Sequence, residues 1–314
     1  AKDLANRFGL DVKASELFFT CGAAPALISI IKALIVDADS EIMAVAPFFP
    51  EYKPFIESSG NKFVMVPADT TSFQIDMAAL ESLVNEHTQA IIVNSPNNPT
   101  GAVMEKSDLE ALVDLIVAND LYVITDEIYS ELTYTDDGHV SIASLPGMRD
   151  RTIYINGLSK SHAMTGWRIG YACGPEVILQ QMLKIHQFAI MCAPTTSQYA
   201  GVSALKNGDE DVAHMRDEYN GRRRYLMHRF KEMGLECFEP FGAFYVFPCI
   251  KEFGMTSEEF ATRLLQEEKV AVVPGTAFGD CGEGFLRISY AYSLEDLKLA
   301  IGRIQEFITR LRQK

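Results

Sequence analysis

Short apolar runs alternate with segments of helical character along the first half of the chain, from residue 15 to about residue 172. The apolar runs are rich in β-branched and aliphatic residues, which favours strands, whereas the segments between them favour helices. Strands are predicted at 41–46, 62–67, 90–94, 121–125, 152–156 and 168–172. Helices are predicted at 24–36, 50–59, 76–85 and 107–118. This alternation predicts an α/β fold with a mostly parallel central sheet and helices on both faces.

The helix predicted at 107–118 has a marked start. Ser107 and Glu110 stand at the spacing of a capping box, in which the serine hydroxyl and the glutamate carboxylate accept hydrogen bonds from amides of the first turn. We therefore expect Ser107 to cap this helix.

The pattern changes after Asn207 and Gly208, where a long charged helix is predicted to run to about Met233 and mixed strands and helices follow. The chain closes with a predicted helix at 293–312, whose apolar residues recur every three or four positions and form one face: Leu297, Ile301, Ile304, Ile308 and Leu311. We predict a large domain over residues 1–208 and a smaller α+β domain over residues 209–314.

The composition is that of an ordinary globular protein, with 48% hydrophobic and 22% charged residues in a chain of 314. It excludes a disordered, collagen-like or coiled-coil chain. The formal net charge is −14, and no Lys/Arg-rich run is present. Because an acidic surface repels phosphate groups, neither nucleic acid nor an anionic membrane is an expected partner, and small molecules are.

The sequence shows no membrane-spanning segment, no signal peptide and no metal-binding motif. The longest apolar stretch, 23–36, is too short to span a bilayer and contains Lys32, and the opening residues do not form a signal peptide. The 6 cysteines stand singly, with no Cys-x-x-Cys and no histidine at metal-ligand spacing. We expect reduced thiols, a cytoplasmic location and no metal site.

A polar loop, Asn94-Ser95-Pro96-Asn97-Asn98-Pro99-Thr100-Gly101, follows the strand predicted at 90–94. Its prolines and glycine forbid a helix or a sheet ladder, and the carboxyl end of a parallel strand is where ligands bind. A plain strand-to-helix loop with asparagine caps explains the same residues.

Two further strands place chemistry at the same predicted sheet edge. Asp126 and Tyr129 follow the strand at 121–125, where an acid either caps a turn or pairs with a cation of a site. Lys160 and Arg168 follow the strand at 152–156. The edge would therefore present a lysine, an arginine, an acid, a tyrosine and an asparagine together.

These motifs, in this order and spacing, resemble the class I/II aminotransferases, the aspartate aminotransferase-like branch of the fold-type I pyridoxal-phosphate enzymes. The resemblance continues to the end of the chain through three further motifs: Pro240-Phe241-Gly242-Ala243-Phe244-Tyr245, Val273-Pro274-Gly275 and Phe285-Leu286-Arg287-Ile288-Ser289. Members of the family usually carry a further N-terminal arm, and we expect that arm and the start of the small domain to be missing here.

The resemblance implies a cofactor, pyridoxal 5′-phosphate, and a role for each matching residue. Lys160 would hold the cofactor as a Schiff base and then, once freed, act as general base and acid at the substrate. Asp126 would keep the pyridine nitrogen protonated, so that the ring can accept electrons. Tyr129 and Asn98 would hydrogen-bond the ring oxygen, and Arg168 would bind the phosphate.

Further contacts to the cofactor are implied around this set. Phe49 would stack on the ring, although a plain core aromatic explains it too. Backbone amides at Gly22-Ala23-Ala24, at the start of a helix, would bind the phosphate. Hydroxyl residues that the family often has at Ala24 and Gly157 are missing, and Ser159 or a neighbouring subunit would compensate.

Arg287 corresponds to the family's arginine that pairs with the substrate α-carboxylate, with Asn98 beside it. A structural ion pair with one of the many acids is the alternative for Arg287. Closure of the small domain would deliver Arg287 to the site and exclude water.

The function implied is transfer of an amino group from an L-amino acid to a 2-oxo acid with ping-pong kinetics, by a homodimer. Two alternatives remain: a β-eliminating lyase on the same fold, and a non-catalytic aminotransferase-like sensor domain. The intact Asn98-Pro99-Thr100-Gly101 loop favours transamination over elimination, and Lys160 with Asp126 disfavours a sensor. The sequence does not distinguish among amino donors or acceptors.

Overall fold

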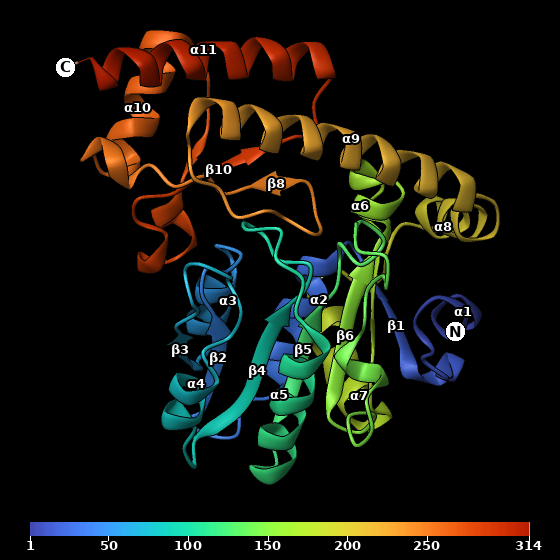
Figure 1. Ribbon diagram of the computed structural model, residues 1–314. Coiled ribbons are helices and arrows are strands. Elements are labelled where there is room, and N and C mark those ends of the chain that lie inside the picture. Colours follow the sequence, from blue (N-terminus) through green and yellow to red (C-terminus); the bar gives the residue numbers. More distant parts are fainter. Residues whose placement is uncertain (314) are drawn as a thin grey trace.

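The computed structural model describes residues 1–313, and a seven-stranded sheet forms its centre (Figure 1). The strand order is β1-β7-β6-β5-β4-β2-β3. The strands are β1 (Leu17–Thr20), β2 (Glu41–Val45), β3 (Lys62–Val66), β4 (Thr88–Asn94), β5 (Tyr122–Asp126), β6 (Thr152–Gly157) and β7 (Gly170–Cys173). Strands β3, β2, β4, β5 and β6 run parallel, whereas β7 is antiparallel to both β6 and β1. The mostly parallel α/β fold expected from the sequence is confirmed.

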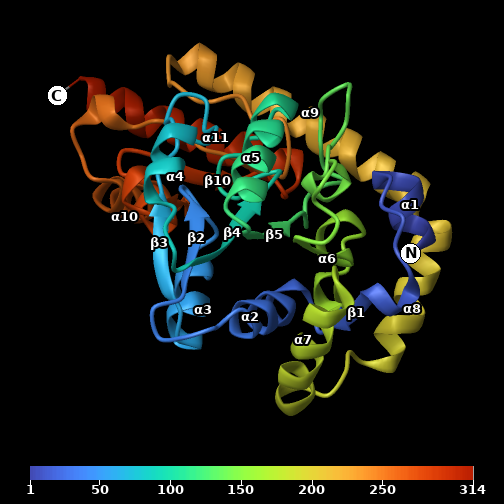
Figure 2. The ribbon, with the colours of Figure 1, turned by 90° about the horizontal axis from the view of Figure 1, so that it is seen from below.

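Helices of the first two thirds of the chain surround this sheet (Figure 2). They are α1 (Lys2–Phe8), α2 (Ala23–Ala33), α3 (Tyr52–Ser59), α4 (Met77–Leu83), α5 (Lys106–Ala118), α6 (Leu158–Ser161), α7 (Glu176–Ala189) and α8 (Thr195–Asn207). Short 3₁₀ helices are η1 (Ala14–Glu16), η2 (Ile142–Ser144) and η3 (Thr165–Trp167).

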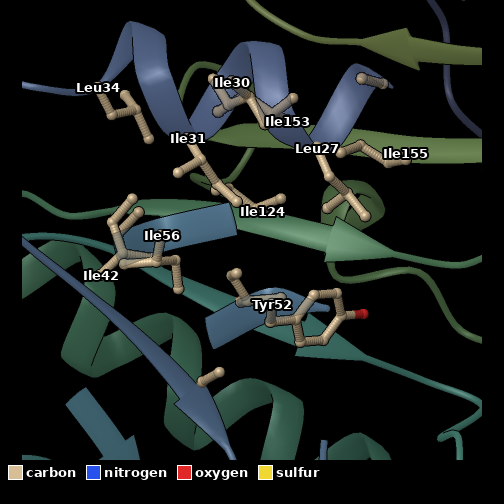
Figure 3. Close-up of a cluster of buried hydrophobic side chains, with 14 of the residues drawn as sticks. Leu27, Ile30, Ile31, Leu34, Ile42, Tyr52, Ile56, Ile124, Ile153 and Ile155 are labelled. Carbon is tan, nitrogen blue, oxygen red and sulfur yellow. The ribbon is translucent and has the colours of Figure 1, made fainter. Parts of the chain in front are cut away.

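Successive side chains of the central strands point to opposite faces of the sheet and pack into two cores, one on each face. On one face Ile42, Ile92 and Ile124 pack with α2, α3 and α7, and Figure 3 shows Leu27, Ile30 and Ile31 of α2 above Ile124 and Ile153. On the other face the intervening strand residues Met43, Ile91 and Val123 pack against Leu80 of α4 and Leu112 of α5. The period of two therefore explains why both faces are covered by helices.

The remainder of the chain forms a second, smaller sheet with its own core, above the carboxyl edge of the large sheet in Figure 1. Its strand order is β8-β10-β9, all antiparallel. The elements are α9 (Asp209–Met233), β8 (Tyr245–Val246), η4 (Lys251–Phe253), α10 (Ser257–Glu268), β9 (Val273–Pro274), η5 (Gly275–Phe278), η6 (Asp280–Gly282), β10 (Leu286–Ser289) and α11 (Leu294–Arg312). Helix α11 buries the face predicted from its periodicity, including Leu297, Ile301 and Ile304. The domain limits at 208 and 209 stay a prediction.

Three local expectations need correction. Helix α5 begins at Lys106 with Glu105 as N-cap and no side-chain cap, because the Glu105 carbonyl already accepts from the amides of Asp108 and Leu109, so the chain is helical before Ser107. The strand predicted at 168–172 begins at Gly170, because Arg168 is left-handed, with φ 54°. Strand β1 and helices α7 and α8 were missed.

None of the helices within residues 1–313 combines the length and the apolar composition that crossing a membrane requires.

Candidate active site

A cavity of about 280 Å³ lies between the carboxyl edge of the large sheet and the small sheet. Strands β4, β5 and β6 end at it, and β8 and β10 contribute Tyr245 and Arg287 from the other side. Its lining consists of Ala23, Ala24, Leu27, Phe49, Glu51, Asn94, Asn98, Asp126, Ile128, Tyr129, Ser159, Lys160, Thr165, Arg168, Tyr245 and Arg287. Residues separated by more than two hundred positions are thus brought to one site.

Asp126 is the buried acid of this cavity, with 5% of its surface exposed. Burial raises the pKa of the Asp126 carboxyl, and hydrogen bonds oppose the shift: the Tyr52 hydroxyl donates to Oδ2 at 2.7 Å and the Ile128 amide to Oδ1 at 3.3 Å. Tyr52 stands at the first position of α3 and is 1% exposed, and Figure 3 shows its ring inside the core cluster. The core thus fixes the donor that orients Asp126.

Lys160 extends into the cavity from the short helix α6, directly after β6. Its Nζ lies 5.9 Å from the centroid of the Tyr129 ring and 5.6 Å from that of Phe244. Burial lowers the pKa of the Lys160 ammonium, with Arg168 and Arg287 acting in the same direction and Asp126 opposing them. A larger fraction of this amine is therefore neutral, and nucleophilic, than of an exposed lysine.

Tyr129 and Asn98 form a polar wall beside the lysine. The Tyr129 and Tyr245 hydroxyls share a hydrogen bond of 2.9 Å, and burial raises the pKa of the Tyr129 phenol well above its ordinary value. Asn98 accepts a hydrogen bond at Oδ1 from Arg287 Nη1 at 3.0 Å. Among the described residues its Nδ2 group has no partner, so this donor is available to a ligand.

Arg287 lies on β10 between two aromatic rings, with its guanidinium carbon 4.6 Å from the centroid of Tyr245 and 4.9 Å from that of Phe278. It forms no ion pair with the acids of residues 1–313, and its Nε is buried without a hydrogen-bond partner there. Arg287 lines the cavity, and a guanidinium without an ion pair suits an anion bound there.

The opposite end of the cavity is built from Arg168 and the start of α2. Arg168 donates from Nη1 to the Thr165 carbonyl at 2.9 Å and from Nη2 to the Cys21 carbonyl at 3.4 Å. A Cβ on Gly22 would lie 2.4 Å from Arg168 Nη2, and one on Gly170 would lie 2.5 Å from the Gly22 carbonyl carbon. Only glycines permit this approach, which places a guanidinium beside a helix N-terminus, an arrangement suited to a phosphate.

Most residues predicted for the site line this cavity. They are Ala23, Ala24, Phe49, Asn98, Asp126, Tyr129, Ser159, Lys160, Arg168 and Arg287. Gly22 is not in the lining and instead packs on Arg168. At Gly157 a Cβ would lie 2.9 Å from the Ile169 carbonyl oxygen, so the position has no room for a hydroxyl side chain.

Sequence reasoning missed Tyr52, Tyr245 and Glu51 as site residues. Tyr245 ends the motif Pro240-Phe241-Gly242-Ala243-Phe244-Tyr245, to which the sequence assigns no role. Glu51 and Tyr52 follow the predicted ring-stacking residue Phe49 closely, and this proximity is the one sequence signal for them. For metal ions, residues 1–313 hold no group of three or more His, Cys, Asp or Glu side chains suited to ligation.

Comparison with known proteins gives a consistent result. The model of the family "Aminotransferase class I and II" matches residues 1–304. The chain is 46% identical to a putative aminotransferase, YugH, of Bacillus subtilis over 97% of this chain and 79% of that protein. It is 44% identical to an aspartate aminotransferase of Pyrococcus abyssi, over 93% of this chain and 76% of that protein.

A solved structure agrees. The aromatic aminotransferase from Pyrococcus horikoshii OT3 superposes with a TM-score of 0.96 at 41% identity, covering 99% of this chain and 84% of that one.

Proposed function

The chain belongs to the class I and II aminotransferases, and from that premise we propose that its cavity binds pyridoxal 5′-phosphate, with Lys160 as the amine that carries it. Members of this family depend on that cofactor and transfer an amino group from an amino acid to a 2-oxo acid by a ping-pong mechanism, and the chain is an enzyme of this kind. The observation that carries the proposal is one cavity lined by Lys160, Asp126, Tyr129, Arg168 and Arg287.

The residues present fit the cofactor by their chemistry. A buried carboxylate, Asp126, suits a protonated pyridine nitrogen, because an opposite charge compensates the cost of its burial. A lysine amine whose pKa is lowered by burial suits an aldehyde, because the neutral amine is the form that condenses with it. Arg168 beside the start of α2 suits the phosphate, and the free Asn98 amide and the Tyr129 hydroxyl suit the ring oxygen. Phe49 lines the same cavity and is proposed to stack on the ring.

When bound, the cofactor supplies an aldehyde that condenses with amines and a ring that accepts the electrons left at the substrate α-carbon. Residues of this chain would transfer the proton and hold the reacting groups in position. Lys160 Nζ would act as the base that removes the proton from the substrate α-carbon, and its lowered pKa makes more of the amine neutral than in an exposed lysine. Asp126 would stabilise a positive charge on the ring nitrogen, and the Tyr52 hydroxyl and the Ile128 amide hold Asp126 in place.

Arg287 is proposed to bind the substrate α-carboxylate. The rings of Tyr245 and Phe278 orient the guanidinium, and Asn98 Oδ1 accepts a hydrogen bond from its Nη1. A planar donor pair matches a carboxylate, so this contact fixes the α-carbon relative to Lys160. The structural ion pair considered as an alternative for Arg287 is not formed with any described residue.

We also propose that the chain acts as a homodimer, because one side of the molecule exposes large apolar side chains. Phe188 is 96% exposed, Met191 77% and Tyr199 75%, all in or beside α7 and α8. Trp167, next to the proposed phosphate ligand Arg168, is half exposed on the same part of the chain. Several large apolar side chains exposed on neighbouring segments favour a protein interface at α7 and α8.

The experiment is a visible spectrum of the protein loaded with pyridoxal phosphate, before and after addition of single L-amino acids, with Lys160→Ala as the control. Transamination predicts that the bound cofactor loses its yellow colour and that the matching 2-oxo acid forms without ammonia. Release of ammonia would indicate the β-eliminating lyase. No spectral response to any amino acid in the wild-type protein would favour the sensor, although all the relatives named above are called aminotransferases.

A further inference from the structure

The Tyr245 hydroxyl has no role in the chemistry described so far, although it belongs to the cavity. Tyr245 lines the cavity from the start of β8, and its hydroxyl shares a hydrogen bond of 2.9 Å with the Tyr129 hydroxyl. Both side chains are buried, with 4% of Tyr129 and 7% of Tyr245 exposed, and neither hydroxyl has a second hydrogen-bond partner within residues 1–313. The two hydroxyls carry two protons and share one bond, so one proton remains available to a ligand.

Main-chain hydrogen bonds fix the position of Tyr245 from two sides. Two residues before it, the amide of Ala243 donates to the carbonyl of Leu132 at 2.9 Å, and Leu132 follows Tyr129 closely on the same segment of the large sheet's edge. Tyr245 itself pairs with Ser289 of β10 in the small sheet. The distance between the two hydroxyls therefore depends on the backbone as well as on the two side chains.

The position of Arg287 indicates which of the two hydroxyls donates. Its guanidinium carbon lies 4.6 Å from the centroid of the Tyr245 ring, and this positive charge opposes the rise that burial causes in the pKa of the Tyr245 phenol. Burial raises the pKa of the Tyr129 phenol well above its ordinary value. Because the more acidic phenol is the better donor, the shared bond runs from Tyr245 to Tyr129, and Tyr129 keeps its own proton for the cavity.

We infer that Tyr245 is a positioning residue, whose hydroxyl donates to Tyr129 and so turns the Tyr129 proton towards the ring oxygen of the cofactor. A hydroxyl that accepts a hydrogen bond is itself a stronger donor, so the pair stabilises negative charge on that oxygen better than Tyr129 alone. The inference rests on the proposed function, which takes Tyr129 as a donor to the ring oxygen. The titratable groups that face the two hydroxyls are Asp126 of β5, Lys160 of α6, Tyr219 of α9 and Arg287 of β10.

The test is a pH titration of the visible absorption of the cofactor-loaded protein, with Tyr245→Phe beside the wild-type protein. Phenylalanine keeps the ring that faces Arg287 and removes only the hydroxyl. Weaker donation to the ring oxygen disfavours its negatively charged form, so the midpoint of the titration is expected to rise by about half a pH unit. An unchanged or lowered midpoint would overturn the inference.

Tyr129→Phe separates the inference from the proposed function. It should raise the midpoint by more than Tyr245→Phe does, and the double variant should show no further rise, because Tyr245 acts through Tyr129. A full additional rise in the double variant would overturn the inference. If Tyr129→Phe raises the midpoint and Tyr245→Phe does not, the inference fails and the proposed function stands. If Tyr129→Phe leaves the midpoint unchanged, the proposed role of Tyr129 fails, and the inference fails with it.

Tyr290→Phe is the matched control. The Tyr290 hydroxyl is also buried and donates at 3.1 Å to the carbonyl of Ala243, on the segment that leads into Tyr245, but Tyr290 does not line the cavity. Its loss should lower Tm and leave the spectral midpoint unchanged. If Tyr290→Phe moves the midpoint as far as Tyr245→Phe does, loosening of this segment explains the shift, and the role assigned to the Tyr245 hydroxyl is wrong.

Discussion

Tyr52→Phe removes a single oxygen from the core and tests whether Asp126 is held as a charged, hydrogen-bonded acid. The ring stays, so the packing around Ile56 and Ile124 is kept (Figure 3). The hydroxyl lost is the one that donates to Asp126 Oδ2 at 2.7 Å, and both residues are buried, at 1% and 5% exposure. The variant therefore leaves one carboxylate oxygen without its donor.

The stability lost in Tyr52→Phe depends on whether the acceptor, the Asp126 carboxyl, is ionised. A buried hydrogen bond to an ionised group contributes about 2 kcal/mol, and a neutral one about 1 kcal/mol. For a protein of this size, about 2 kcal/mol corresponds to a fall in Tm of roughly 5 °C. Since the Tyr52 bond opposes the effect of burial, its loss raises the pKa of the Asp126 carboxyl further.

The pH dependence has a definite sign. Burial already raises the pKa of Asp126 above its ordinary 3.8, so its ionisation costs stability as the pH rises through the folded-state pKa. The Tyr52 bond reduces that cost only when the carboxyl is ionised. The difference in Tm between the wild-type protein and Tyr52→Phe is therefore largest at neutral pH and becomes smaller towards acid pH.

The assay is thermal unfolding of the cofactor-free protein from acid to neutral pH. Tyr122→Phe is the control, because Tyr122 lies on the same strand as Asp126 and packs on the same core as Tyr52. The Tyr122 hydroxyl has no hydrogen bond among the described residues. Tyr122→Phe should lower Tm by much less. An effect of Tyr52→Phe that equals that of the control, or that does not change with pH, would refute the account of Asp126.

Three further outcomes are expected. Arg168→Gln should raise the dissociation constant of pyridoxal phosphate about 10- to 100-fold with little effect on Tm, and equal affinity in an equilibrium titration would exclude Arg168 as the phosphate ligand. Gly170→Ala should destabilise the protein by about 1–3 kcal/mol, because its Cβ would lie 2.5 Å from the Gly22 backbone, whereas Gly302→Ala in α11, with no atom within 4 Å, should stabilise it slightly; thermal unfolding checks both. Because burial lowers the pKa of Lys160, an amine reagent should modify this lysine at half its maximal rate below pH 10.5, as followed by mass spectrometry. The free-energy cost of burying the Lys160 ammonium should also diminish as the pH rises towards 10.5. A midpoint of modification at or above pH 10.5 would contradict the lowered pKa.

The alternation of strands and helices was readable because each central strand is apolar on both faces, as Ile42 and Met43 or Ile91 and Ile92 show. Strand β1 was missed because it is short and lies at the sheet edge, with Phe19 46% exposed. Helix α8 was missed because Tyr199 and Val202 face outward, so its apolar residues do not mark a core face.

The site was predictable where a motif carried it and not where only folding creates it. Lys160, Asp126 and Asn98 stand in motifs at strand ends, and the parallel sheet brings them to one edge. Tyr52 is different, since its role depends on a hydroxyl that reaches across 74 positions to Asp126. Ser107 shows the converse: its local spacing suited a capping box, but the chain was already helical before it.

The most direct test of the central claim is to load the protein with pyridoxal phosphate, reduce it with borohydride and map the modified peptide by mass spectrometry. The account predicts stable attachment of the cofactor to Lys160 and none in Lys160→Ala, with prior addition of a reactive amino acid abolishing the label. Attachment to a different lysine, or equal labelling with and without Lys160, would contradict it.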